Sequence, residues 1–309
     1  MQADGLVILR VAGASRRYGD HAALDDVSLQ IHAGEVYALV GRNGAGKSTL
    51  AKAAIGALSL DQGSVRVLDG DPARDPAARR IIGVAPQEIA LYPHMTVEEN
   101  LHAFATLAGV REGRAEAVRE AMDAAACTGR ADQRIDHLSG GWRRRANIAA
   151  AIVHKPRLLV LDEPTEGLDA ETRGVLRRLI ETLRARRTAI LLISHDAEDV
   201  ASLADRVGVL HAGRLAVEGK PAVLMQQAFG ARQELTVRLG AHAPLAAPIL
   251  NGHGLSSQDG LSFCGLIDDA PAQALQIDQA LRAAGIDVRE LAVRPPRIDA
   301  LIDWAGRAR

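Results

Sequence analysis

The chain has 309 residues and a formal net charge of −1, with 37 Lys and Arg against 38 Asp and Glu. That length suits one large domain, or one domain of ordinary size with a smaller one attached. With balanced charge the chain has no global basic field that would favour nucleic acid, so we expect no nucleic-acid partner and expect any binding surface to be local. The two cysteines, Cys127 and Cys264, lie far apart and outside any metal-ligand spacing, which indicates buried thiols in a reducing compartment.

The N-terminal residues 1–5 lack the charged and apolar regions of a signal peptide. No stretch approaches the roughly 18 consecutive apolar residues that a membrane-spanning helix needs. We therefore expect a cytoplasmic chain that does not cross the bilayer by itself.

The first predicted elements are strands. Apolar and polar residues alternate over residues 6–11 and 27–31, which predicts half-buried and antiparallel strands. Between them, Tyr18 precedes Gly19 and Asp20 in a predicted turn.

A glycine-rich loop follows the apolar run 36–40 and precedes a helix-forming stretch that begins at Leu50. Its residues are Gly41, Arg42, Asn43, Gly44, Ala45, Gly46, Lys47, Ser48 and Thr49. Glycines let successive backbone N–H groups curve toward phosphates, and the helix adds its positive N-terminal end. Lys47 can reach the outer phosphates and Ser48 can ligate Mg²⁺, so the loop predicts a nucleoside triphosphate site.

The pattern becomes helical from Thr96, which is a predicted N-cap with Glu99 at the capping-box position, and it stays helical to about residue 127. Further on, Ser139, Gly140 and Gly141 form a turn that opens another helix. This turn could be a second anion site or an ordinary N-cap, and the arginines at 143–145 could be a solvated face.

Two acids end an apolar run at 158–161, and a second apolar run spans 189–193. Both runs are typical of buried parallel strands, whose carboxyl ends form the ligand crevice of an α/β sheet. We expect Asp162 to hold Mg²⁺ through water, opposite Ser48, and Glu163 to act as the general base on the attacking water.

After residue 220 the composition shifts to loops rich in Ala, Pro and Gly. Strands are predicted at 234–239, 261–267 and 288–293, and helices near 272–283 and 298–305. We therefore expect a nucleoside-triphosphate-binding domain over 1–220, with a helical subdomain at about 88–155, and a small accessory α+β domain over 221–309.

With these motifs in order, residues 5–220 resemble the ATP-binding subunit of ATP-binding cassette (ABC) transporters. The resemblance implies a P-loop NTPase core of α/β class with an antiparallel β subdomain and a helical subdomain. It implies that Tyr18 stacks on adenine, that Gln87 senses Mg²⁺ and the membrane partner, and that Asp169 belongs to the D-loop. It also implies that His195 contacts the γ-phosphate.

In this family two copies face head to tail, and the turn at Ser139, Gly140 and Gly141 completes the partner's ATP site. The resemblance thus implies ATP and Mg²⁺ as cofactors, a homodimer or paired ABC subunit, and integral membrane permease subunits. Two positions depart from the common pattern: Trp142 stands where glutamine is common, and Arg42, at an exposed position, where proline is common.

Residues 91–100 and 144–150, with the ending at 294–307, look most like the daunorubicin-resistance type of exporter ATPase, which pairs with ABC-2 permeases. Apolar side chains over 87–93 should form part of a groove for the permease. The alternatives are the ATPase of an importer, a soluble ABC ATPase acting on ribosomes or DNA ends, and a regulatory module that holds ATP without turnover. A ribosome-acting ABC ATPase usually has two cassettes and a DNA-end ABC ATPase needs a long coiled coil, and this chain shows neither. The complete acidic pair argues against a regulatory module without turnover.

Overall fold

The computed structural model describes residues 5–307 except 195, 196, 242 and 258, and the side chains of 197–199 are also outside the description. The chain divides into two compact units. The first contains residues up to Pro221 together with Ala305–Arg309, and the second is Ala222–Trp304. The final helix therefore ends in the first unit, whereas the sequence assigned all of 221–309 to the accessory domain.

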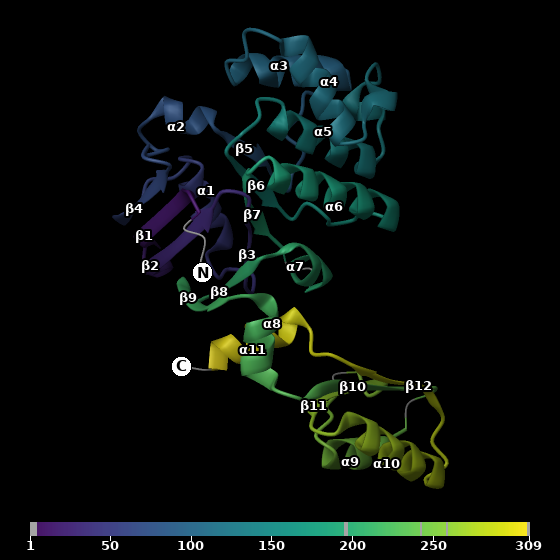
Figure 1. Cartoon of the computed structure of the whole chain (residues 1–309). Coiled ribbons are helices and arrows are strands. Elements are labelled where there is room, and N and C mark those ends of the chain that lie inside the picture. Colours follow the sequence, from purple (N-terminus) through teal and green to yellow (C-terminus); the bar gives the residue numbers. More distant parts are fainter. Residues whose placement is uncertain (1–4, 195–196, 242, 258, 308–309) are drawn as a thin grey trace. The chain divides into compact units, whose positions relative to one another are not determined.

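The main sheet of the first unit, over the described residues, has six strands in the order β5-β6-β7-β3-β8-β9 (Figure 1). The strands are β3 (Val36–Val40), β5 (Ile82–Ala85), β6 (Leu158–Asp162), β7 (Ala189–Ile193), β8 (Arg206–His211) and β9 (Arg214–Gly219). Neighbouring strands are parallel except for β8 and β9. The carboxyl ends of β3 and β6 therefore lie at one edge of the sheet, separated by β7.

Strands β3, β6 and β7 are buried along almost their whole length, which explains their continuous apolar sequences. In β6, Leu158 and Val160 belong to one hydrophobic core and Leu159 and Leu161 to another. The first core includes α1 (Lys47–Ala54) and the second includes α6 (Ala170–Ala185). The buried parallel strands predicted at 158–161 and 189–193 are thus confirmed.

A separate antiparallel sheet contributes to the first core. Its described strands are β1 (Val7–Tyr18), β2 (His21–His32) and β4 (Gln62–Val67), in the order β2-β1-β4. The predicted early strands are confirmed but longer than the alternation alone indicated, because several register shifts allow β1 and β2 to stay paired across irregular positions. Two short helices of this unit are α2 (Pro76–Arg80) and α7 (Ala197–Leu203).

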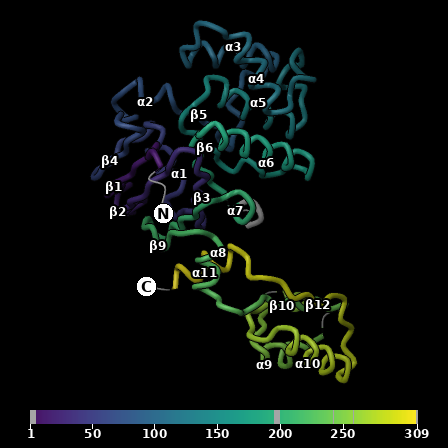
Figure 2. The backbone as a smooth tube through the Cα atoms, viewed as in Figure 1, coloured from purple at the N-terminus to yellow at the C-terminus, as the bar shows by residue number. Residues whose placement is uncertain are grey.

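The helical insertion leaves the main sheet after β5 and returns at its neighbour β6, as the tube in Figure 2 shows. It contains α3 (Val97–Leu107), α4 (Arg114–Ala124), α5 (Gly140–Ile152) and two short 3₁₀ turns, Thr128–Arg130 and Ile135–His137. The predicted capping box is present: Thr96 Oγ1 accepts from the Glu99 N–H at 3.1 Å, and Glu99 accepts from the Thr96 N–H at 2.8 Å.

The second unit contains an antiparallel sheet, with the described strands in the order β11-β10-β12. Its strands are β10 (Gln233–Leu239), β11 (Ser262–Ile267) and β12 (Val288–Arg294). Helices α9 (Ala246–Gly252) and α10 (Ala270–Ala283) share its core, and α8 (Pro221–Phe229) and α11 (Ile298–Arg307) lie at the two ends of this part of the sequence. The predicted strands and the helices near 272–283 and 298–305 are confirmed.

The expectation that both cysteines are buried is half wrong. Cys127 is buried, and burial raises the pKa of its thiol to about 12. Cys264 is exposed, because it alternates with the buried Phe263 along β11 and so points away from the core. Over the described residues, none of the helices is both long and apolar enough to span a membrane.

Candidate functional site

The glycine-rich loop connects β3 to α1 as predicted. Gly46 is the N-cap of α1 with φ of 108°, a left-handed conformation that L side chains rarely adopt. A Cβ there would lie 2.2 Å from the Ala23 carbonyl oxygen, so only glycine fits. A Cβ at Gly44 would meet no atom within 4 Å, so this side of the loop is open to a ligand. Arg42 is exposed, as expected for a variable loop position.

Lys47 lies on the first turn of α1 and is held by its own loop. Its Nζ donates to the Gly41 carbonyl at 2.6 Å and to the Arg42 carbonyl at 3.2 Å. Partial burial lowers the pKa of Lys47, while the carboxylates of Glu163 and Asp162 oppose that shift. The amine and the two acids therefore share one electrostatic environment, although they are more than a hundred residues apart in sequence.

The two acids differ in their surroundings. Burial raises the pKa of Asp162 above its usual range and the neighbouring Glu163 charge adds to the rise, while Lys47 opposes it. Glu163 is 9% exposed and has φ of 47°, a left-handed value that is unusual for a residue with a side chain. Its N–H donates to the Ile193 carbonyl at 2.9 Å, which fixes this strained position against the end of β7.

The residues present fit a Mg²⁺ ion. Ser48 is exposed beside Lys47 on α1, and Asp162 ends β6, two strands from the loop. At a strand spacing of about 4.8 Å, the ends of β3 and β6 lie about 10 Å apart, which leaves room for phosphate, metal and water. Among the described side chains, no cluster of three or more His, Cys, Asp or Glu could hold a metal. Mg²⁺ would therefore rely on Ser48, Asp162, water and substrate oxygens, which is how it is usually bound.

Gln87 lies on the loop after β5 and is exposed. Its Nε2 donates to Glu166 Oε2 at 2.7 Å, so in this structure its amide is bound to the segment that follows the acidic pair. The backbone beside it is anchored by helix α5: Arg144 donates to the Pro86 carbonyl at 2.8 Å and Asn147 donates to the same oxygen at 3.2 Å.

The sequence analysis did not assign Glu166, Arg144 or Asn147. The one signal for Arg144 was its place in the arginine run at 143–145, which left a solvated face open as an interpretation. That interpretation holds for Arg143 alone, because Arg144 and Arg145 are only 7% and 8% exposed.

The Ser139, Gly140 and Gly141 turn lies at the start of α5, grouped with α3 and α4 and apart from α1 (Figure 1). Ser139 has N-cap geometry, but its side chain makes no capping hydrogen bond, and Ser139 and Gly140 are exposed. The structure therefore does not bring this turn to the chain's own Lys47. Its hydroxyl and N–H groups are available to a ligand presented from outside.

The remaining predicted residues lie in different settings. Tyr18 ends β1, is 49% exposed, and has the Arg16 guanidinium 5.2 Å from its ring centroid. Asp169 is the N-cap of α6 and accepts from the Thr172 N–H at 2.8 Å, and this bond lowers the pKa of Asp169. His195 lies outside the described residues.

A glycine-rich loop between β3 and α1, an acid pair at the end of β6 and a helical insertion on a largely parallel sheet are typical of a P-loop nucleoside triphosphatase. A family model for ABC transporters matches residues 24–166. Nod factor export ATP-binding protein I of Bradyrhizobium diazoefficiens is 40% identical over 222 residues, or 71% of this chain and 72% of that protein. The protein of the same name from Rhizobium etli is 38% identical over 218 residues, or 70% of this chain and 69% of that protein.

Solved structures agree. An ATP-binding subunit of an ABC transporter has a TM-score of 0.67 at 29% identity, over 71% of this chain and 92% of that one. A dimeric bacterial ABC transporter cassette has a TM-score of 0.63 at 26% identity, over 69% and 98%. The chain belongs to the ATP-binding subunits of ABC transporters and is an ATPase of that family. The resemblance and the fold class expected from the motifs are confirmed.

Proposed function

We propose that two copies of this chain hydrolyse MgATP beneath a separate integral membrane permease of ABC-2 type, and that this hydrolysis drives export. The observation that carries the proposal is that Lys47 and the acidic pair meet at one edge of the sheet, whereas the exposed Ser139 turn lies elsewhere on the same chain. Export is supported by the relatives named Nod factor export ATP-binding protein I. The chain would then sit peripherally on the inner face of the cell membrane.

In this proposal each residue has a defined task on its own chain. The loop N–H groups and Lys47 bind the phosphates, and Tyr18 supports the adenine ring. Ser48, Asp162 and Gln87 would hold Mg²⁺, Asp162 through water, and the ion supplies charge neutralisation at the phosphate oxygens. Glu163 accepts the proton of the attacking water, and His195 contacts the γ-phosphate.

The second half of each site would come from the partner chain. Ser139 leaves its hydroxyl free of capping, and a helix N-terminus with two exposed small residues suits a phosphate. Asp169 lies close to this turn, because Thr172 donates its N–H to Asp169 and also packs against Gly141. Asp169 would therefore approach the same interface. A paired cassette is supported by the dimeric relative of known structure.

The surface for the permease is smaller than the sequence indicated. Leu91 is only 7% exposed and Ile89 packs on the same core, so the apolar run 87–93 does not present all its side chains outward. Leu91 fills the core of the helical insertion, which is why it can be apolar without a partner. Tyr92 remains 50% exposed, with its ring centroid 6.2 Å from that of Phe104, and we propose it as the permease contact.

The substitution Glu163→Gln tests the catalytic assignment. It removes the base but keeps the side-chain shape, so ATP hydrolysis should fall by at least about 100-fold while ATP binding stays within about twofold. ATP should also convert the variant from monomer to a long-lived dimer, measured by sedimentation. Hydrolysis at the wild-type rate would remove Glu163 from this role.

A further inference from the structure

Trp142 occupies the first turn of α5, directly after Gly141, and two arginines lie close to its ring. The Arg145 guanidinium carbon lies 4.6 Å from its ring centroid and that of Arg130 lies 5.3 Å from it. The indole is half-buried and packs against the core of the helical insertion. Guanidinium groups at this distance from an indole are attracted by its negative π face, more strongly where water is excluded.

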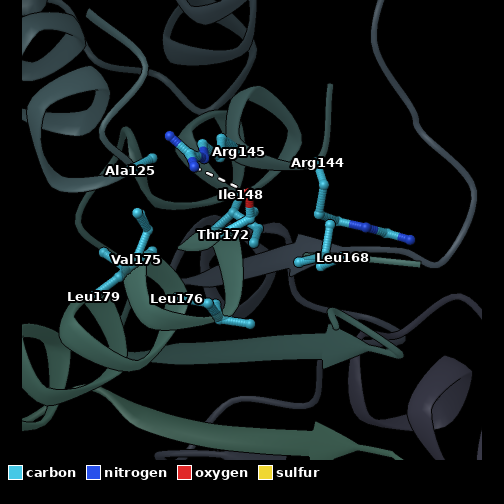
Figure 3. Close-up of a pocket in the computed structure, with 9 residues that line it drawn as sticks. All are labelled: Ala125, Arg144, Arg145, Ile148, Leu168, Thr172, Val175, Leu176 and Leu179. Atoms are coloured by element: carbon cyan, nitrogen blue, oxygen red, sulfur yellow. Dashed lines mark hydrogen bonds between the residues drawn. The ribbon is translucent and has the colours of Figure 1, made fainter. Parts of the chain in front are cut away.

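Arg145 links this stack to α6. Its Nη2 donates to Thr172 Oγ1 at 3.0 Å and lies 3.4 Å from a Glu171 carboxylate oxygen. Figure 3 shows Arg145 directed at Thr172, whereas Arg144 points the other way. The Nε of Arg145 is buried and has no hydrogen-bond partner within the described part of the chain, while its guanidinium lies over the Trp142 ring.

Thr172 connects the arginine to the two turns proposed to face a partner chain. Its N–H donates to Asp169, the N-cap of α6. On the other side, a Cβ at Gly141 would lie 3.3 Å from Thr172 Oγ1, so the Ser139 turn packs directly on this residue. One threonine and one arginine therefore join the start of α5 to the start of α6.

We propose that Trp142 and Arg145 are positioning residues that hold the Ser139 turn and the Asp169 turn in one fixed relation for contact with the nucleotide of a partner chain. This inference rests on the proposed function, because it needs the ATP site to be shared between chains. Burying a guanidinium is a poor way to gain stability, since apolar residues of similar volume often serve as well. The burial of Arg145 beside two exposed turns is better explained by a role in fixing the orientation of those turns.

The test compares Trp142→Leu with Trp142→Phe in the Glu163→Gln background. Leucine keeps apolar volume but removes the π face, whereas phenylalanine keeps a face. The ATP-dependent dimer dissociation constant should rise about tenfold for Trp142→Leu and less than about threefold for Trp142→Phe. ATP affinity of the monomer should stay within about twofold in both, because Lys47 and its loop are unchanged.

Arg145→Met should weaken the dimer as Trp142→Leu does. The double variant should dimerise no more weakly than either single variant, since both changes break the same Trp142–Arg145 contact. Arg143→Met is the matched control, because Arg143 is exposed on the same turn, and it should change the constant by less than about twofold. If Arg145→Met does not fold, the comparison of Trp142→Leu with Trp142→Phe still tests the proposal.

Equal dimer dissociation constants for Trp142→Leu and Trp142→Phe would overturn the positioning role and leave the proposed function intact. A lower melting temperature with an unchanged dimer dissociation constant would do the same. If the parent Glu163→Gln variant forms no dimer with ATP, the shared site is wrong and the positioning role falls with it.

Discussion

Asp162 and Glu163 are adjacent acids with different constraints. Asp162 ends a buried strand and has a raised pKa, whereas Glu163 adopts a left-handed backbone angle of 47° that the end of β7 holds in place. Their identities and order were predictable, because an apolar strand that ends in two acids is a local pattern. The left-handed backbone angle of Glu163 could not be predicted, because it depends on a contact with β7, a strand distant in the sequence.

The raised pKa of Asp162 leads to a prediction on stability. Folding favours the protonated acid, so its stabilising contribution is present at low pH and is lost as pH rises through the folded pKa. Asp162→Asn should therefore raise the melting temperature of the nucleotide-free protein by about 2 °C at pH 8, and by less at pH 4.5. Hydrolysis should fall sharply, because a carboxylate proposed to hold Mg²⁺ is lost.

The control for this prediction is Asp61→Asn. Hydrogen bonding to the Arg17 backbone and the nearby Arg16 charge lower the pKa of Asp61, so its ionised form stabilises the fold at neutral pH and above. Asp61→Asn should not raise the melting temperature at pH 8. An identical melting curve for wild type and Asp162→Asn at both pH values would contradict the burial argument.

At the scale of elements, prediction succeeded where one segment carries the signal. The apolar runs at 158–161 and 189–193 predicted β6 and β7, and the capping box of Thr96 and Glu99 predicted the start of α3. Helix α9 was missed because Pro248 and Gly252 usually indicate a loop, yet Pro248 lies in its first turn, where no helical N–H is needed. The contacts of Arg144 and Asn147 with Pro86 were also missed, because they join segments more than fifty residues apart.

The capping box of α3 should contribute measurably to stability. Thr96→Ala removes the acceptor for the Glu99 N–H and should lower the free energy of unfolding by about 1 kcal/mol, measured by urea denaturation. Thr106→Ala is the control, because Thr106 is exposed and its hydroxyl only bonds the His102 carbonyl within the same helix. Similar losses from the two substitutions would show that the cap is not the stabilising feature.

At the scale of the molecule, the first unit contains both elements that we propose to face phosphate, the Lys47 loop and the Ser139 turn, but does not bring them together. Lys47 and the acidic pair share one environment, and the Ser139 turn is exposed on the helical insertion. None of the residues assigned to the ATP site lies in the second unit, which we propose to be an accessory domain. The sequence motifs implied a shared site by family resemblance, and the geometry of a single chain supports the same proposal.

The most direct test mixes two inactive variants. Lys47→Ala removes the amine proposed to bind phosphate and Ser139→Arg blocks the exposed turn, so each variant alone should hydrolyse almost no ATP. In a mixed pair, one site combines the intact loop of one chain with the intact turn of the other. The account predicts that single-turnover hydrolysis reappears on mixing, whereas activity no greater than the sum of the separate variants would contradict a site built from two chains.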